Sequence, residues 1–161
     1  WMRVKEILMN TESSKSQIKI LILSGPNLNL LGEREPETYG DQTLESHIET
    51  AEKAADQKGM TVEHLQSNHE GALVDAIHSA RGRCDAIIIN PGAFTHYAWA
   101  IHDALQTFDG PVIEVHLSNP AAREPWRHTS VVAPVAAGTI AGFGGYGYQI
   151  AVDAVSELLT Q

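Results

Sequence analysis

Residues 84–92 read CDAIIINPG, and this stretch decides the fold class of the chain. Isoleucine is β-branched and favours strands, and an uninterrupted apolar run is typical of a strand that is buried on both faces of a sheet. Pro91 and Gly92 follow at once and end such a strand. The stretch therefore predicts a buried parallel strand over residues 84–90, with the polar side chain of Asn90 at its carboxyl end.

Strands and helices alternate on both sides of this strand, as the spacing of apolar residues indicates. Strand-like stretches lie at residues 19–23, 60–67, 111–118 and 130–132, and helical spacing covers residues 44–59, 69–81, 96–108 and 147–159. Thr43, Asn68 and Thr95 stand where helix N-caps are expected. This order predicts an α/β fold, namely a flavodoxin-like, doubly wound five-stranded parallel sheet with helices on both faces.

Length and composition fit one globular domain. The chain has 161 residues, of which 43% are hydrophobic and 19% are charged. Such a composition supports a buried core. Because residues 11–17 are polar and turn-rich, we expect a flexible N-terminal arm over residues 1–17. A single flavodoxin-like domain is then expected over residues 18–161.

Charge and cysteine content narrow the function classes. The net charge of -9 argues against binding to nucleic acid or to a membrane surface, since both require a basic face. The single cysteine, Cys84, excludes an internal disulfide framework and a cysteine-rich zinc site. No secretory signal pattern and no apolar run of about 20 residues occur, so we expect a cytoplasmic protein.

Polar and cationic side chains gather where three of the predicted strands end. The segments 24–41, 90–96 and 114–128 follow these strands, and ligands of a doubly wound sheet bind at the carboxyl ends of its strands. Amides, histidines and arginines together suit an anionic, hydroxylated small molecule. The side chains concerned are Asn27, Asn29, Arg34, Tyr39, Asn90, His96, His116, Ser118, Asn119, Arg123 and Arg127.

Some of these residues also have an ordinary structural explanation. Asn27 follows Pro26, and such asparagines often belong to turns. Tyr39 precedes Gly40 in a loop, where a tyrosine commonly packs on its neighbours. His96 stands at a predicted helix start and is equally typical of a cap.

Two pairs are more informative. Glu114 and His116 are two residues apart on one predicted strand, so their side chains share a face, and the carboxylate can orient or charge-tune the imidazole. A purely structural hydrogen-bonded pair remains the alternative. Arg123 and Arg127 are four residues apart and form a double cation site if their segment is helical. A solvated surface pair is the alternative there.

Several other motifs carry no function. Residues 142–147 read GFGGYG, but no strand–helix–strand unit follows this match to a dinucleotide-binding pattern. The strand ends lack the clustered carboxylates of a phospho-receiver domain, and no nucleophile elbow occurs. No paired histidine spacing indicates a metal. We expect four other histidines to be solvated: His47, His64, His69 and His78.

The segments GPNLNLLGEREPETYG, NPGAFTHYAWAIHDAL and EVHLSNPAAREPWRH resemble, in order and spacing, the type II 3-dehydroquinases, or 3-dehydroquinate dehydratases. The likeness covers about residues 18–159. It implies a dodecamer built from four trimers, and reversible trans-dehydration of 3-dehydroquinate to 3-dehydroshikimate through an enolate. The reaction serves the shikimate pathway of aromatic amino acid biosynthesis or quinate breakdown, and no metal or cofactor is implied.

The resemblance also implies roles for individual residues. Tyr39 matches the base, Arg34 its activating lid arginine, and Arg123 a second lid arginine. His116 matches the general acid, and Asn27 the residue that holds the water stabilising the enolate. The remaining matches are substrate contacts, with the aspartate reaching the site of a neighbouring subunit: Asn90, His96, Asp103, Leu117, Ser118 and Arg127.

The chemistry agrees with these roles. A free tyrosine is only about 0.1% ionised at pH 7, and two nearby guanidiniums favour the phenolate in a water-poor site. The loop over residues 24–42 is long for such a domain, as expected of a lid. Two alternatives remain open: a binding module without chemistry that uses Arg123, Arg127 and His96, and a metal-free hydrolase that uses His116 and Glu114.

Overall fold

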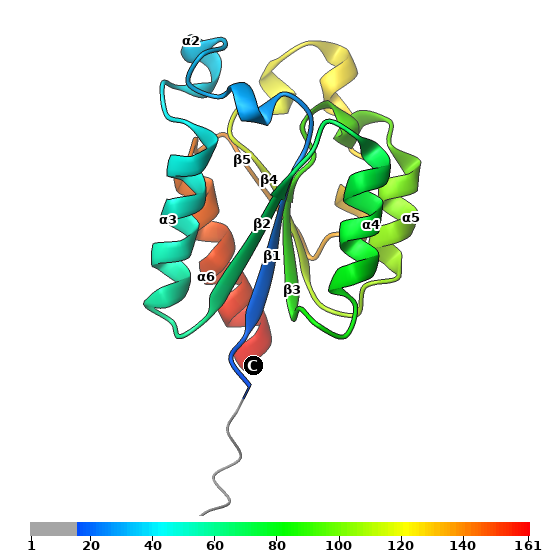
Figure 1. Ribbon diagram of the computed structural model, residues 1–161. Coiled ribbons are helices and arrows are strands. Elements are labelled where there is room, and N and C mark those ends of the chain that lie inside the picture. Colours follow the sequence, from blue (N-terminus) through cyan, green and yellow to red (C-terminus); the bar gives the residue numbers. More distant parts are fainter. Residues whose placement is uncertain (1–15) are drawn as a thin grey trace, which may run out of the picture.

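Five parallel strands form a single sheet in the computed structural model, which describes residues 16–161 (Figure 1). The strands are β1 (Lys19–Ser24), β2 (Thr61–Gln66), β3 (Ala86–Asn90), β4 (Val112–His116) and β5 (Gly138–Ala141). They are arranged in the order β2-β1-β3-β4-β5, which places the topological switch point between β1 and β3. The predicted α/β fold with a five-stranded parallel sheet is confirmed.

Helices cover both faces of the sheet (Figure 1). On one face α3 (Leu44–Asp56) packs beside α6 (Tyr146–Thr160), and on the other α4 (Glu70–Ala80) packs beside α5 (Trp99–Gln106). Shorter helices lie in the connecting segments: η1 (Leu28–Leu30), α2 (Pro36–Tyr39), η2 (Gly92–His96), η3 (Pro120–Ala122), η4 (Pro125–His128) and η5 (Ala133–Val135).

The alternation of side chains along β1 explains why its apolar run is continuous. Ile20 and Ile22 belong to the core beneath α3 and α6, whereas Leu21 and Leu23 belong to the core beneath α4 and α5. Every residue of β3 is buried. Both faces therefore select apolar residues, which is the pattern that the sequence predicted.

The position of the fifth strand was predicted wrongly. β5 is Gly138–Ala141, and residues 130–132 form no strand. The hydroxyl of Ser130 instead accepts hydrogen bonds from the backbone N–H groups of Val132 and Ala133, at 3.1 and 2.9 Å. This local turn competes with strand pairing, which the apolar residues of the stretch had suggested.

Of the three predicted N-caps, only Thr43 is confirmed, because its hydroxyl accepts a hydrogen bond from Ser46 N at 3.2 Å. Thr95 lies inside η2, and α5 begins only at Trp99. The cap of α4 is His69, while the side-chain oxygen of the neighbouring Asn68 accepts a hydrogen bond from Asn27 N at 3.0 Å. In both wrong predictions, the polar side chain of Thr95 or Asn68 forms a hydrogen bond with a residue distant in sequence and does not cap the helix.

The predicted flexible arm over residues 1–17 lies outside the described residues, apart from Ser16 and Gln17. Within the described part of the chain, no helix combines the length and the apolar character needed to cross a bilayer.

His47 is buried, which contradicts the predicted solvation. The ring is 2% exposed on the inner side of α3 and stacks on Tyr148, with ring centroids 5.9 Å apart. Neither ring nitrogen has a hydrogen-bond partner among the described residues. Burial lowers the pKa of His47 below 6.5, so the ring is neutral at pH 7.

We therefore expect the free energy of unfolding to fall as the pH drops below about 6.5, partly because of His47. The folded state holds the ring neutral, so the unfolded chain binds this proton first and gains stability at acid pH. His47→Leu should flatten that pH dependence and raise the free energy of unfolding by about 1 kcal/mol at pH 7, because the unpartnered nitrogens are lost. Urea unfolding between about pH 5 and pH 7.5 measures both effects.

His78→Leu is the matched control, since His78 is an exposed histidine on α4. It should keep the pH dependence of the parent protein. Equal slopes of stability against pH in the two variants would remove His47 from this account.

Candidate active site

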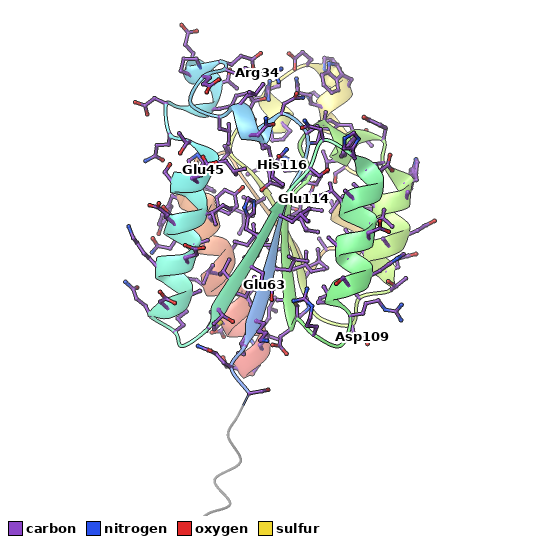
Figure 2. All side chains as sticks on the ribbon, viewed as in Figure 1. Arg34, Glu45, Glu63, Asp109, Glu114 and His116 are labelled. Carbon is purple, nitrogen blue, oxygen red and sulfur yellow. The ribbon has the colours of Figure 1, made fainter. Side chains whose placement is uncertain are left out.

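The segments that follow β1, β3 and β4 meet at one end of the sheet. Gly25 N donates a hydrogen bond to Asn90 O at 2.8 Å, and a Cβ on Gly25 would overlap the backbone of Pro91. Asn27 then adopts a left-handed conformation with φ of 66°, which asparagine tolerates well. Figure 2 places Arg34, Glu114 and His116 toward this end and Asp109 at the opposite end.

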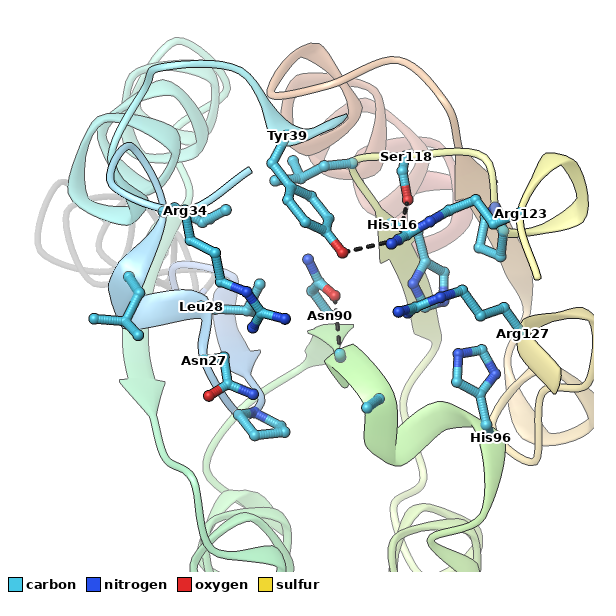
Figure 3. Close-up of a pocket in the computed structure, with 17 residues that line it drawn as sticks. Asn27, Leu28, Arg34, Tyr39, Asn90, His96, His116, Ser118, Arg123 and Arg127 are labelled. Carbon is cyan, nitrogen blue, oxygen red and sulfur yellow. Dashed lines mark hydrogen bonds between the residues drawn. The ribbon is translucent and has the colours of Figure 1, made fainter. Parts of the chain in front are cut away.

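Ten of the predicted site residues line one pocket at this end of the sheet, whereas Asn29, Asn119 and Asp103 do not (Figure 3). Asp103 lies on α5 with its side chain exposed. Apolar side chains that the sequence did not single out, among them Leu30 and Leu31, complete the wall. The predicted residues in the pocket are Asn27, Arg34, Tyr39, Asn90, His96, His116, Leu117, Ser118, Arg123 and Arg127.

The pocket concentrates positive charge in a chain whose net charge is -9. Arg34, Arg123 and Arg127 line it, and its described lining includes no aspartate or glutamate. Arg34 approaches from one wall, and Arg123 and Arg127 approach from the other (Figure 3). The arrangement suits a small anion with hydroxyl groups. Residues 16–161 contain no cluster of three or more His, Cys, Asp or Glu that could hold a metal ion.

Tyr39 is held by one of the two predicted arginines. Arg123 Nη1 donates to the Tyr39 hydroxyl at 2.8 Å and to the Ser118 hydroxyl at 3.2 Å. The guanidinium carbon of Arg123 lies 5.2 Å from the centre of the tyrosine ring. Arg34 forms an ion pair with Glu35 at 3.8 Å, and its side chain is 47% exposed. Arg123 therefore contacts the Tyr39 hydroxyl directly, whereas Arg34 lines the pocket from the loop after β1 and stays partly exposed.

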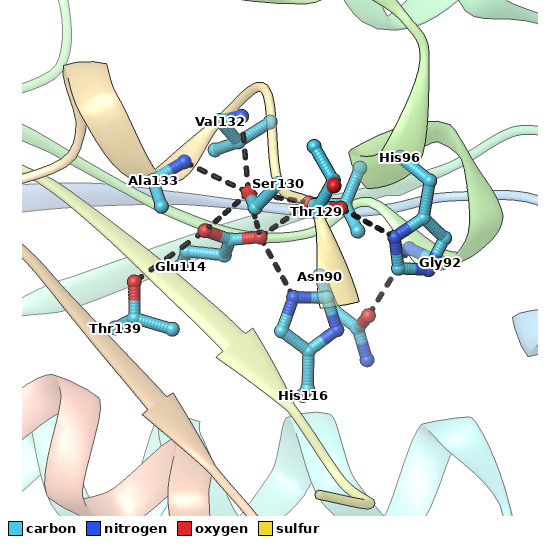
Figure 4. Close-up of polar contacts among 11 residues, drawn as sticks. Asn90, Gly92, His96, Glu114, His116, Thr129, Ser130, Val132, Ala133 and Thr139 are labelled. Carbon is cyan, nitrogen blue, oxygen red and sulfur yellow. Dashed lines mark hydrogen bonds and ion pairs between the residues drawn. The ribbon is translucent and has the colours of Figure 1, made fainter. Parts of the chain in front are cut away.

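Glu114 and His116 form the pair that the sequence predicted. His116 Nε2 lies 2.7 Å from Glu114 Oε1, and the side chains are 12% and 0% exposed, respectively. The carboxylate also accepts hydrogen bonds from the hydroxyls of Thr95, Ser130 and, at 3.4 Å, Thr139 (Figure 4).

These contacts fix the charge of Glu114. Burial raises its pKa, but the hydrogen bonds from His116, Thr95 and Ser130 outweigh burial and hold the pKa below its usual range. The carboxylate is thus ionised at neutral pH, and His116 Nε2 must carry a hydrogen. Because His116 lines the pocket, its Nδ1 is the nitrogen available to a ligand.

His96 presents a neutral ring. Its Nδ1 lies 2.7 Å from Thr129 O, and since a carbonyl can only accept, Nδ1 carries the hydrogen. Burial lowers the pKa of His96, with smaller contributions from nearby charges. The neutral ring leaves Nε2 as an acceptor for a ligand hydroxyl.

Two further lining residues are positioned by their neighbours. Asn90 lines the pocket, and its Oδ1 accepts a hydrogen bond from Gly92 N at 3.2 Å, which fixes the side chain. The Arg127 guanidinium lies 4.0 Å from the ring centre of Trp126. Arg123 and Arg127 both line the pocket, although their segment forms 3-10 turns and no α-helix, and Glu124 Oε2 lies 2.5 Å from Arg127 Nε and 4.0 Å from Arg123 Nε.

Three residues of the site were missed by sequence reasoning. Thr95, Ser130 and Thr139 supply the hydroxyls around Glu114, and each comes from a different connection or strand. Their spacing carries no common period. A buried, ionised carboxylate requires hydrogen-bond donors around it. The burial of Glu114 is therefore the one signal that could have indicated these three hydroxyls.

Comparison with known proteins gives one consistent family. The family model described as Dehydroquinase class II matches residues 18–156. A catabolic 3-dehydroquinase of Aspergillus clavatus is 55% identical over 137 residues, which are 85% of this chain and 91% of that protein. The 3-dehydroquinate dehydratase 2 of Pseudomonas putida is 52% identical over 142 residues, 88% of this chain and 95% of that protein. The crystal structure of a type II dehydroquinase from Butyrivibrio crossotus has a TM-score of 0.85 at 46% identity, covering 87% of this chain and 98% of that one.

Proposed function

The chain belongs to the class II dehydroquinase family, and from this premise we propose how its pocket carries out the reaction. The protein is a type II 3-dehydroquinate dehydratase, a lyase that converts 3-dehydroquinate to 3-dehydroshikimate and water. The names of its relatives fit both a biosynthetic role in the shikimate pathway and a role in quinate catabolism. The observation that carries the mechanism is the placement of Tyr39, with Arg123 on its hydroxyl, in the same pocket as His116, which contacts the buried Glu114.

Tyr39 is the proposed base. It removes the proton from the carbon next to the ketone of 3-dehydroquinate, and the electron pair of that C–H bond forms the enolate. Arg123 Nη1 lies 2.8 Å from the Tyr39 hydroxyl and places a positive charge beside the oxygen that accepts the substrate proton. Arg34 adds a second positive charge when the loop that carries it closes over the substrate. Asn27 holds a water molecule against the enolate oxygen.

His116 is the proposed acid. The enolate collapses to a conjugated enone as the C–O bond of the neighbouring hydroxyl breaks, and the proton on His116 Nδ1 joins the departing oxygen to form water. Glu114 balances the positive charge of the doubly protonated ring. The water takes its hydrogen from His116, whereas the proton from the substrate carbon stays on Tyr39. Tyr39 then releases one proton to solvent and His116 takes one up, so that each turnover removes one water molecule from the substrate.

The remaining lining residues bind the substrate. The backbone of Leu117 and Ser118 is proposed to receive the substrate carboxylate beside Arg123. Asn90, His96 and Arg127 contact the substrate hydroxyls. All of these groups are side-chain or backbone atoms of the protein, so we propose a reaction that needs no metal or cofactor.

Absorbance tests this function directly, because the product contains a conjugated enone and the substrate does not. Addition of 3-dehydroquinate should give a rise in ultraviolet absorbance that is proportional to the protein concentration. Binding of the substrate without any rise would leave only the binding-module alternative.

Arg34→Lys should lower kcat by about tenfold and move the acidic limb of the pH–rate profile to higher pH. Lysine keeps the charge but loses the planar fork, so the phenolate of Tyr39 is less favoured. Steady-state kinetics across the pH range measure both effects. The control is Arg81→Lys at an exposed position remote from the pocket. An unchanged acidic limb in Arg34→Lys would argue against activation of Tyr39 by this residue.

We propose that the protein assembles as trimers that build a dodecamer, with Asp103 completing the site of a neighbouring subunit. Asp103 is exposed on α5 and lies outside the pocket of its own chain. Trp99, one helical turn earlier on the same face, is 62% exposed. An exposed carboxylate beside a large exposed ring suits a subunit interface.

Asp103→Ala should therefore lower activity by more than about tenfold, because the partner cations are left unpaired. Light scattering of the parent protein should give about twelve times the chain mass. Asp109→Ala is the control, since Asp109 is exposed at the opposite end of the sheet (Figure 2). A fully active monomer would contradict both the assembly and the shared site.

The domain organisation and location are also proposals. Residues 18–161 are proposed to form the single catalytic domain, which is supported by one continuous sheet across them. A cytoplasmic location stays a prediction from the sequence, and cell fractionation tests it.

A further inference from the structure

One short segment contacts three separate parts of the site. Thr129 O accepts the hydrogen bond from His96 Nδ1 at 2.7 Å. Ser130 Oγ lies 2.9 and 3.0 Å from the two carboxylate oxygens of Glu114. Val131 N donates to Thr95 O at 2.7 Å. Residues 129–131 therefore connect the proposed acid pair with a proposed substrate contact.

The two lone pairs and the single hydrogen of the Ser130 hydroxyl decide which hydrogen bonds it accepts and which it donates. Its hydroxyl oxygen has two lone pairs, which accept from Val132 N and Ala133 N at 3.1 and 2.9 Å. Its single hydrogen can then go only to an acceptor, and the carboxylate of Glu114 is within reach. Two backbone groups thus make the Ser130 hydroxyl a donor, and of the acceptors within reach, the Glu114 carboxylate and Thr95 Oγ, the charged carboxylate forms the stronger hydrogen bond.

Thr95 acts from the other side. Its hydroxyl lies 3.0 Å from Ser130 Oγ, which has no free lone pair, so the hydrogen of Thr95 also goes to Glu114 Oε1. With His116 Nε2 on the same oxygen, the fully buried carboxylate is surrounded by donors. A carboxylate in this setting is a poor proton acceptor.

We infer that Ser130 is a positioning residue that keeps Glu114 ionised, so that His116 keeps its hydrogen on Nε2, can hold a second hydrogen on Nδ1, and donates that second hydrogen to the departing hydroxyl. The inference rests on the proposed function. Ser130 does not line the pocket and acts through Glu114. It also fixes the ring, because an ionised Glu114 keeps hydrogen on His116 Nε2 and turns Nδ1 toward the pocket.

Ser130→Ala should lower kcat by about tenfold and change KM by less than about twofold, since no substrate contact is removed. It should also move the basic limb of the kcat profile to higher pH. When the Glu114–His116 pair loses a proton, the Glu114 carboxylate is left buried without a positive partner. Ser130→Ala removes one hydrogen-bond donor from this carboxylate, so the pair keeps its proton to a higher pH. The other titratable groups around the pair are unchanged in the variant: Tyr39 on α2, His96 on η2, Arg123 after η3 and Arg127 on η4.

Two further variants separate positioning from general damage. Ser130→Thr keeps the hydroxyl and should restore most of kcat and the original basic limb. Ser156→Ala removes a half-buried serine on α6, far from the pair, and should leave kcat and the profile unchanged. Thermal unfolding checks that Ser130→Ala is folded at the assay temperature.

Nitrogen NMR with isotope-labelled histidine gives a readout that does not depend on turnover. The neutral ring of His116 should carry its hydrogen on Nε2 in the parent protein and should show a mixture of tautomers in Ser130→Ala. A parent-like kcat profile and a parent-like tautomer in Ser130→Ala would overturn the inference. An inactive parent protein would instead overturn the proposed function, so the two failures are distinguishable.

Discussion

Tyr39→Phe should lower kcat by about 10² to 10⁴, which is the range for loss of a general base. The substitution removes one oxygen atom and leaves the ring, so the contact between ring and Arg123 persists. The Arg123 guanidinium keeps its second partner, the Ser118 hydroxyl, and no buried charge is left without a partner. KM should therefore change little, and the loss should appear in kcat, as measured by the absorbance of the enone.

Tyr146→Phe is the matched control, because Tyr146 is 58% exposed at the start of α6 and does not line the pocket. It should keep the kcat of the parent protein within about twofold. Near-normal turnover in Tyr39→Phe would assign the base to another group.

His116→Ala should lower kcat by a similar factor of about 10² to 10⁴, since the departing hydroxyl then lacks a proton donor. Glu114→Gln should cost less, because the amide oxygen can still accept from His116 Nε2 while the negative charge is lost. Kinetics of the two variants at several pH values measure the difference. Equal and small losses would reduce the Glu114–His116 pair to a structural contact.

The fold was predictable because the burial of strands on both faces leaves a strong signal in the sequence. β3 reads AIIIN with every residue buried, and the parallel arrangement follows from alternation with helices. The carboxyl-end rule then identified the segments that meet in the pocket. Tyr39 and Arg123 are 84 residues apart in sequence but join at 2.8 Å, since each follows a strand that ends at the same edge.

The remainder depends on contacts that have no period in the sequence. β5 is short and partly exposed, so its pattern was weaker than that of residues 130–132, whose turn is set by the Ser130 hydroxyl. The burial of His47 follows from its helical position between buried Leu44 and Ala51, yet its polar ring suggested solvent. Asp103 lies outside the pocket of its own chain, so its proposed role requires the pocket of a neighbouring subunit.

The division of labour between base and acid is the central claim, and hydrogen exchange in deuterated water tests it most directly. The measurement follows the hydrogen on the carbon next to the ketone of 3-dehydroquinate, beside the formation of the enone. In His116→Ala, Tyr39 should still remove this hydrogen, so deuterium should enter the substrate faster than enone forms. In folded Tyr39→Phe, neither exchange nor enone formation should exceed the rate without protein. Exchange at the parent rate in Tyr39→Phe, or none in His116→Ala, would contradict the account.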